Sequence, residues 1–434
     1  MRTEKEKMNR NWLFRNGRII DPVNGVDREG DLLVVGGRIA GPSEEAPANV
    51  RVVEAKGCWV VPGLIDMHVH LREPGEEYKE DIVTGTRAAA AGGFTAVACM
   101  PNTRPVNDNG AVTARILERA REGFARVYPV GAISSGSRGE SLAGYGELKD
   151  AGAVAVSDDG LPVLDSQLMR RALEYASDHG LTVISHSEEW SLSRNGVMNE
   201  GVVSTRLGLK GIPVAAEAIM VYRDIALAEY TGRPVHIAHV SCAMSVELIR
   251  AAKARGVRVT AETAPHYFSL TDEAVLEYDT NAKMNPPLRT ESDRQAIVSG
   301  LADGTLDCVA TDHAPHSQLE KEVEFDLAAN GIIGLETAVP LTLALVRDKV
   351  ITADRFVELL TVNPASILGV RGGSLSPGAP GDITLIDPEL RFEYTEEAVV
   401  SKSRNSPFLG RQLQGRALLT MVEGLVTFDL RAGE

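Results

Sequence analysis

Eight apolar runs, each followed by a stretch of helical character, constrain the fold of this chain more than any other feature. The runs are rich in β-branched residues, and helical stretches such as SQLMRRALEYASDHG and SVELIRAAKARG end in Gly180 and Gly256 as C-terminal caps. Strands that alternate with helices indicate βα units around a parallel sheet. Eight such units in about 300 residues predict an α/β fold, a (β/α)8 TIM-like barrel, whose functional groups lie at the C-terminal ends of the strands. The predicted strands end at His70, Met100, Ile133, Asp159, Ser187, Val240, Thr263 and Asp312.

Both ends of the chain have a different texture, with short β-like runs separated by turns. LFRNGRIIDP and VRVVEAKGCWVVPG are examples near the start, and GSLSPGAPGDITLIDP and RALLTMVEGLVTFDL near the end. We therefore expect a small β-sandwich domain built from both chain ends, with the barrel inserted between its halves. The predicted boundaries are 1–62 and 371–434 for the two halves of this domain and 63–370 for the barrel.

Polar side chains stand at the predicted strand ends, where a purely structural barrel would tolerate any residue. His68 and His70 are two residues apart on one strand, so their rings point to the same face and can meet one metal ion. An HxH pair alone is weak evidence, and a carboxylate beside Gly160 can simply be a turn former. Together, histidines and carboxylates at converging strand ends predict a divalent metal such as zinc, with one position open for water. The further candidates are Asp158, Asp159, His186, His239 and Asp312.

Net charge and cysteine usage restrict the binding partners and the cellular compartment that we expect for the protein. A formal net charge of -15 argues against nucleic-acid and anionic-membrane surfaces, so an anionic substrate would need a local cation or metal. The four cysteines form no CxxC pair, which favours reduced thiols in a cytoplasmic protein. The charged start MRTEKEKMNRNWLF has no apolar segment behind it, and no apolar run of about 18 residues occurs, so we expect neither secretion nor membrane insertion.

An ordered series of motifs across almost the whole chain resembles the amidohydrolase superfamily and, within it, the bacterial class I dihydroorotases. The motifs are PGLIDMHVHLREPG, ACMPNTRPVND, VSDDG, ISHSE, HIAHVS, TAETAPHYFSLT, NPPLR, ATDHAPHS, GLET and SRNSPFLGRQLQGR. The resemblance implies the zinc-dependent, reversible cyclisation of N-carbamoyl-L-aspartate to (S)-dihydroorotate plus water, a step of de novo pyrimidine (UMP) biosynthesis.

The resemblance also implies the metal ligands. One zinc would take His68, His70, a bridging aspartate and Asp312, and a second would take the bridge, His186 and His239. Some similar proteins bind one zinc, and we favour two per subunit. Spacing to His186 favours Asp159 as the bridge, although alternation along the strand leaves Asp158 and Asp159 both open. Many relatives use a carboxylated lysine here, whereas the nearest lysine, Lys149, lies before the strand.

The substrate carries carboxylate groups, which need local partners. Arg72 follows the metal histidines directly and is placed to grip a carboxylate with two hydrogen bonds. Asp312, beside the metal-activated water, is the candidate catalytic residue that carries a proton to the leaving nitrogen. Without the resemblance, Asn102 could be a turn residue and His316 a surface residue. The resemblance adds the remaining candidate substrate contacts: His70, Asn102, Asn285, His316, Asn330 and Gly331.

Two other interpretations remain at this point. A hydantoinase or allantoinase would share the barrel and the chemistry, but an aspartate in place of the bridging lysine, together with Arg72 and His316, weighs against it. A catalytically dead scaffold for a partner such as aspartate transcarbamoylase would be expected to lose metal histidines, and this chain keeps them. A complex with aspartate transcarbamoylase is compatible with activity, and we expect a homo-oligomer.

Overall fold

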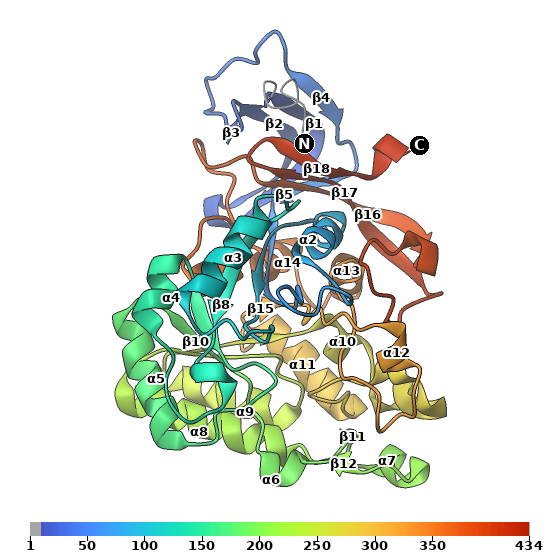
Figure 1. The fold of residues 1–434 in the computed structure, drawn as a ribbon. Coiled ribbons are helices and arrows are strands. Elements are labelled where there is room, and N and C mark those ends of the chain that lie inside the picture. The colour runs from blue at the N-terminus through green and yellow to red at the C-terminus, as the bar shows by residue number, and fades with distance from the viewer. Residues whose placement is uncertain (1–9, 434) are drawn as a thin grey trace.

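The computed structural model describes residues 10–433, and the larger of its two domains is a closed barrel of eight parallel strands (Figure 1). The strand order β15-β14-β13-β10-β9-β8-β7-β6 follows the chain order, and every neighbouring pair is parallel. The predicted barrel is therefore confirmed. The strands are β6 (Leu64–Val69), β7 (Phe94–Cys99), β8 (Arg126–Gly131), β9 (Ala155–Ser157), β10 (Thr182–Ser185), β13 (Val235–Ile237), β14 (Val259–Thr263) and β15 (Cys308–Val309).

The barrel closes where its first strand meets its last. Val69 pairs with His313 in a parallel bridge, and the His70 N–H donates to the His313 carbonyl at 2.8 Å. The buried Asp66 carboxylate accepts hydrogen bonds at 3.1 Å from the N–H groups of both His68 and Thr311, which ties the two strand ends together. This contact fixes the register at the rim where the polar residues stand.

Helices cover the outside of the strands because each strand is buried on both faces. The run FTAVAC of β7 is buried along its whole length, as expected for parallel strands between helices. Both predicted glycine caps are confirmed, since Gly180 and Gly256 follow α5 and α9 with φ of 62° and 81°. The main covering helices are α2 (Ile82–Ala91), α3 (Gly110–Ala120), α4 (Tyr145–Ala151), α5 (Ser166–Asp178), α8 (Ala215–Thr231), α9 (Ala243–Ala254), α11 (Glu291–Asp303), α13 (Ala338–Arg347), α14 (Ala353–Leu360) and α15 (Val362–Leu368).

Shorter elements lie in the connections between these strands and helices. They are α6 (Trp190–Ser193), β11 (Met198–Asn199), α7 (Val202–Leu207), β12 (Gly211–Ile212), α10 (Pro265–Ser269) and α12 (Gln318–Lys321). The last of these belongs to the long connection after β15, which carries several of the predicted substrate contacts.

The two chain ends share one mixed sheet above the barrel, with both described termini at this end of the molecule (Figure 1). Its order is β18-β17-β16-β5-β1-β2-β3, with β4 paired to β1, and antiparallel pairing of β5 with β16 joins the two halves. The sheet encloses its own apolar cluster, which combines Phe14 and Val34 with Leu385 and Leu419. The strands are β1 (Trp12–Asp21), β2 (Val26–Val35), β3 (Arg38–Ile39), β4 (Arg51–Glu54), β5 (Trp59–Pro62), β16 (Ile383–Glu393), β17 (Gln412–Val422) and β18 (Leu425–Asp429).

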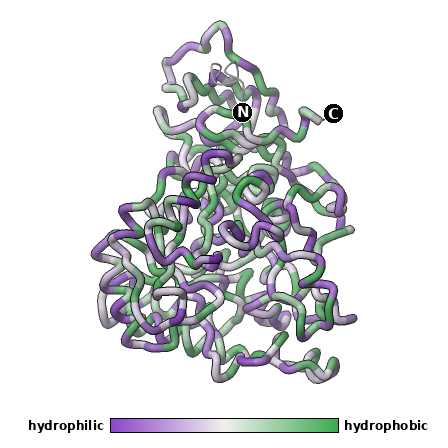
Figure 2. The backbone as a smooth tube through the Cα atoms, viewed as in Figure 1, coloured by the Kyte–Doolittle hydropathy of each residue, from purple (hydrophilic) through white to green (hydrophobic). Residues whose placement is uncertain are grey.

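Hydrophobic and hydrophilic residues alternate along the backbone, which fits elements that bury one side (Figure 2). Within residues 10–433, no helix is long and apolar enough to cross a membrane. The charged residues 1–9, part of the segment in which we expect no secretion signal, lie outside the described residues.

Candidate active site

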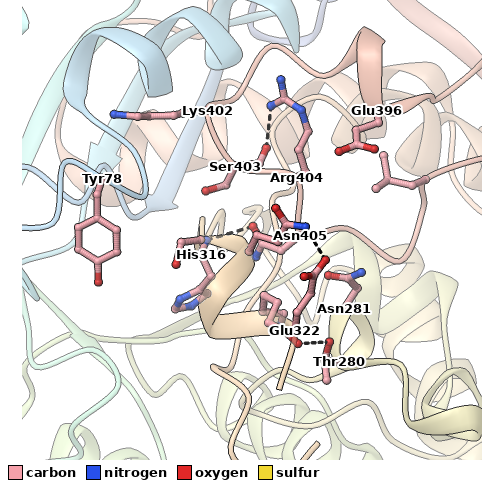
Figure 3. A pocket seen from close by; sticks show the side chains of 14 residues that line it. Tyr78, Thr280, Asn281, His316, Glu322, Glu396, Lys402, Ser403, Arg404 and Asn405 are labelled. Carbon is pink, nitrogen blue, oxygen red and sulfur yellow. Dashed lines mark hydrogen bonds between the residues drawn. The ribbon is translucent and has the colours of Figure 1, made fainter. Parts of the chain in front are cut away.

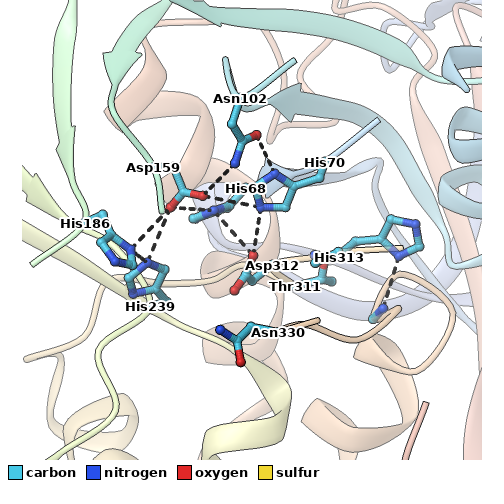
Figure 4. Close-up of polar contacts among 12 residues, drawn as sticks. His68, His70, Asn102, Asp159, His186, His239, Thr311, Asp312, His313 and Asn330 are labelled. Atoms are coloured by element: carbon cyan, nitrogen blue, oxygen red, sulfur yellow. Dashed lines mark hydrogen bonds and ion pairs between the residues drawn. The ribbon is translucent and has the colours of Figure 1, made fainter. Parts of the chain in front are cut away.

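Six of the predicted metal-site side chains meet at one rim of the barrel (Figure 4). His68 lies in β6, and the others lie within three residues of the C-terminal ends of β6, β9, β10, β13 and β15. His239 and Asp312 adopt φ values of 36° and 49°, a left-handed conformation that is uncommon for residues other than glycine and clusters at functional sites. The six residues are His68, His70, Asp159, His186, His239 and Asp312.

Asp159 lies at the centre of this group. Its Oδ1 is 3.3 Å from His68 Nε2, 3.7 Å from His186 Nδ1 and 3.4 Å from His239 Nε2. Its Oδ2 is 3.4 Å from His70 Nε2. The ligand atoms of His68, His70 and Asp159 lie within 4.8 Å of one another, and those of Asp159, His186 and His239 do so as well. One carboxylate is therefore shared by two sets of potential ligands.

The neighbouring Asp158 faces a different part of the molecule. Its carboxylate accepts hydrogen bonds from the Ser134 hydroxyl and, at 3.1 Å, from the Ser134 N–H. Lys149 lies on the exposed side of α4, where its Nζ donates to the Gly180 carbonyl at 3.1 Å. Of the two aspartates that the sequence left open, Asp159 is the one that faces the histidines.

Asp312 completes the first set. Its Oδ1 is 3.1 Å from His70 Nε2 and 3.5 Å from His68 Nε2. Burial on its own lowers the pKa of His68, but the carboxylates of Asp159, Glu262 and Asp312 raise it well above its ordinary value. The negative charge of the carboxylates is therefore balanced by protons on the histidines or by a cation.

Unpaired buried atoms support a metal between these side chains. Within the described part of the chain, neither His68 Nε2 nor Asp159 Oδ1 has a hydrogen-bond partner, although both are buried. The two atoms lie 3.3 Å apart as an ion-pair contact, but buried polar atoms without a hydrogen bond are costly unless something else binds them. Imidazole nitrogens and carboxylate oxygens are the ligands that zinc prefers besides thiolates, so the donor set fits a divalent metal.

A second layer of carboxylates, which the sequence did not predict, bonds to the histidines from behind. Glu262 Oε1 lies 2.7 Å from His68 Nδ1, and its Oε2 lies 3.2 Å from His236 Nε2. Glu188 Oε2 lies 2.9 Å from His186 Nε2 and accepts a hydrogen bond at 3.2 Å from Asn285 Nδ2. A glutamate inside the apolar strand VRVTAET was the one signal in the sequence, because a buried carboxylate needs a partner.

A cavity of about 190 Å³ opens beside the histidine and carboxylate cluster. All seven predicted substrate contacts line it, together with several of the cluster side chains. Among the described residues that line it, Arg72 is the one arginine or lysine. The lining residues are His70, Arg72, Asn102, Asp159, Gly160, His186, Asn285, Asp312, Ala314, His316, Asn330 and Gly331.

The polar lining is held in place by contacts among its own members. Arg72 lines the cavity and is 8% exposed; its Nε donates to the Pro315 carbonyl at 3.1 Å, and its Nη2 lies 3.3 Å from His316 Nε2. Asn102 Oδ1 lies 2.8 Å from His70 Nδ1. His316 Nε2 lies 2.7 Å from the Asn330 carbonyl, so this ring nitrogen carries a proton. The cavity thus presents a cation and neutral polar groups beside the carboxylates.

Comparison with known proteins shows the family of the chain. A family model described as dihydro-orotase-like matches residues 57–245. A dihydroorotase from Geotalea daltonii is 60% identical over 419 residues, 96% of this chain and 99% of its own length. One from Desulfotalea psychrophila is 63% identical over 412 residues, 95% of this chain and 98% of its own length.

Solved structures show the same fold at greater distance. An L-hydantoinase from Arthrobacter aurescens is 23% identical with a TM-score of 0.86, covering 96% of both chains. A D-hydantoinase is 25% identical with a TM-score of 0.83, covering 96% of this chain and 95% of its own. A barrel with histidines and carboxylates gathered at its C-terminal rim defines an amidohydrolase. Within that class, the chain belongs to the dihydroorotase family.

Proposed function

We propose that this protein is a dihydroorotase, which hydrolyses the ring amide of (S)-dihydroorotate to N-carbamoyl-L-aspartate and catalyses the reverse ring closure in pyrimidine biosynthesis. One observation carries the proposal: a single cavity is lined both by members of the histidine and carboxylate cluster and by Arg72 with neutral polar side chains. The relatives that are about 60% identical over nearly the whole chain carry the same name.

We propose zinc as the metal, with two ions per subunit favoured over one. The first would be held by His68, His70, Asp159 and Asp312, and the second by Asp159, His186 and His239. Zinc in such a site lowers the pKa of a bound water to about 7 and polarises a carbonyl oxygen. Asp159 fits the bridging role because its carboxylate lies within 4 Å of four imidazoles.

Asp312 is the residue that we assign to proton transfer. Its carboxylate borders both the cavity and the histidines, with Oδ1 at 3.1 Å from His70 Nε2. In hydrolysis the hydroxyl of water joins the ring carbonyl carbon, the C–N bond breaks, and Asp312 passes the remaining proton of the water to the leaving nitrogen. In ring closure the same carboxylate takes the proton from the attacking nitrogen and returns it to the departing water.

The substrate carboxylate would lie against Arg72, Asn102 and His316. Arg72 is the one arginine or lysine among the described residues that line the cavity, in a protein of net charge -15. A buried guanidinium binds a carboxylate with two parallel hydrogen bonds. The N–H and C=O groups of the ring would meet Asn285 and the Asn330–Gly331 segment across the cavity. A hydantoin without a carboxylate offers no counter-charge to the buried guanidinium of Arg72, which disfavours it.

We further propose a cytoplasmic homo-oligomer, compatible with a complex with aspartate transcarbamoylase. The barrel of residues 63–370 would act as the catalytic domain, and residues 1–62 and 371–434 as the small β domain. The break between β5, which ends at Pro62, and β6, which begins at Leu64, supports the first boundary.

Parallel assays with dihydroorotate and a 5-substituted hydantoin test the proposed substrate. We expect turnover of dihydroorotate and little of the hydantoin; turnover of the hydantoin alone would overturn the assignment. In the same assays Asp312→Asn should retain zinc, because the four histidines and Asp159 remain, but lose activity by about 100-fold or more. Undiminished turnover in that variant would remove Asp312 from the proton-transfer role.

A further inference from the structure

The segment Val400–Phe408, which carries the motif SRNSPF, lies against the barrel rim although it belongs to the C-terminal part of the chain. Two carboxylates from barrel loops anchor its start. Glu336 accepts hydrogen bonds at 3.0 Å and 3.1 Å from the N–H groups of Val400 and Ser401, and Glu80 accepts one from the Ser401 hydroxyl. These hydrogen bonds therefore hold the start of the segment against the barrel, ahead of the residues that lie near the substrate cavity.

Asn405 joins this segment to two loops of the cavity wall. Its Oδ1 accepts the N–H of His316 at 3.0 Å, and its Nδ2 donates to the carbonyls of Ala314 at 3.0 Å and Gly331 at 3.1 Å. Its own carbonyl accepts the N–H of Ile333 at 2.9 Å. Asn405 is 4% exposed, and all these contacts cross at least 70 positions of sequence. Figure 3 draws Asn405 beside His316, among the residues that line a second cavity.

The two loops that Asn405 joins depend on one another. His316 Nε2 donates to the Asn330 carbonyl, so the ring of His316 takes its direction from the loop of Asn330 and Gly331. Gly331 adopts a φ of +122°, and a Cβ at this position would lie 2.5 Å from the Cβ of Ala314. The backbones of the two loops also meet directly, since the Ala314 N–H donates to the Ile332 carbonyl at 2.7 Å. Asn405 is a side chain from a distant part of the chain that bonds to both loops.

Other asparagines of the wall do not have this geometry. Asn102 and Asn330 line the cavity itself, whereas Asn405 lies behind it and borders the separate outer cavity of about 430 Å³. A planar amide with one acceptor and two donors matches one N–H and two carbonyls, so each group of its side chain is used. A buried amide with complete hydrogen bonding specifies a single arrangement of the groups around it.

We propose that Asn405 is a positioning residue for substrate binding, which holds His316 and the Asn330–Gly331 segment in register so that they meet the substrate together. It acts through these residues and does not touch the substrate. This inference rests on the proposed function, because it assigns His316 and Gly331 to the binding of dihydroorotate.

Substitution of Asn405 in the full-length, zinc-loaded protein tests the proposal. Asn405→Ala removes three hydrogen bonds, and we expect a KM for dihydroorotate raised by about tenfold or more with kcat changed by less than about threefold. Asn405→Asp keeps the acceptor for His316 and loses both donors, so it should disturb Gly331 more than His316. Asn281→Ala, at a half-buried asparagine of the outer cavity, is the matched control.

Hydrogen exchange measured by mass spectrometry supplies a readout that needs no substrate. In Asn405→Ala, backbone amides of residues 313–316 and 330–333 should exchange about tenfold faster or more, while the rest of the barrel exchanges as in the control. Exchange and KM equal to those of the control would overturn the proposal. Faster exchange throughout the barrel, with kcat and KM unchanged, would assign Asn405 to general stability instead.

Failure of the proposed function is distinguishable from failure of this inference. If the unsubstituted protein does not turn over dihydroorotate, the assignment of substrate is wrong. Local release of the two loops in Asn405→Ala would then still show that Asn405 sets their position, and absence of that release would refute it.

Discussion

Replacing Glu262 by glutamine removes one negative charge directly behind the candidate metal site. Glu262 Oε1 lies 2.7 Å from His68 Nδ1, and both side chains are fully buried. Burial by itself raises the pKa of Glu262, but the charge of His68 and the hydrogen bonds from His236 and His68 lower it to about 2. An anion at this position keeps the proton on His68 Nδ1 and leaves the Nε2 lone pair for a metal.

The expected size of the effect follows from what glutamine keeps. Its carbonyl can accept from His68, and its amide can donate to His236 Nε2, because His236 Nδ1 can carry the proton toward Thr260 Oγ1 at 2.9 Å. Only the charge is lost, and a hydrogen bond to a charged group exceeds a neutral one by about 1 kcal/mol. We therefore expect Glu262→Gln to weaken zinc binding about 5- to 10-fold. Glu262→Ala also leaves the His68 donor unpaired, and the loss should approach about 100-fold.

Zinc affinity can be measured by competition between metal-free protein and a chromophoric chelator. Glu247→Gln, an exposed glutamate on α9, provides a control that removes the same charge far from His68. The account expects the order Glu262→Ala, Glu262→Gln, control in increasing affinity. If both Glu262 variants are folded and bind zinc within twofold of the control, Glu262 does not support the metal site.

Three further predictions concern the cavity wall, pH and the thiols. Gly331→Ala should raise the KM for dihydroorotate about tenfold or more, because the left-handed backbone and the Cβ of Ala314 leave no room; an unchanged KM would refute this. Burial raises the pKa of Glu336 to about 7 despite its backbone hydrogen bonds. Because the folded protein holds this proton more tightly than the unfolded chain does, the contribution of Glu336 to the free energy of unfolding is complete below about pH 4.5. It falls by up to roughly 3 kcal/mol as the pH rises through 7. Denaturant unfolding at pH 5 and 8 should therefore show that the free energy of unfolding changes less with pH in Glu336→Gln than in the unsubstituted protein. An equal change in both proteins would contradict this. Burial raises the pKa of Cys58 to about 11 and the pKa of Cys99 to about 12. Iodoacetamide at pH 8 should therefore label the native protein slowly, but should label all four cysteines after denaturation. Fast labelling of the native protein would show that the thiols are accessible.

The fold was predictable because each barrel strand is a short apolar run between polar turns. The position of each strand was easier to predict than the residue at which it ends. β15 is two residues long, Cys308–Val309, although LDCVATD predicted a longer strand. The ladder ends there because the N–H of Thr311 turns to the Asp66 carboxylate instead of a neighbouring strand.

The histidines and carboxylates of the candidate metal site were predictable because the strand ends of a barrel converge. Sequence alternation could place Asp158 and Asp159 on opposite faces but could not decide which face is inward, since that depends on the packing of Ser134 against Asp158. The side chains that support this site could not be predicted from the sequence for another reason. Glu262 meets His68 across 194 positions and Asn405 meets Ala314 across 91, and nothing local in either sequence neighbourhood specifies those partners.

Dihydroorotate turnover measured before and after zinc is removed tests the central claim most directly. Protein stripped of metal by a chelator should retain its fold, lose turnover of dihydroorotate, and recover it when zinc is added back. Full turnover in protein that elemental analysis shows to be free of metal would contradict the account.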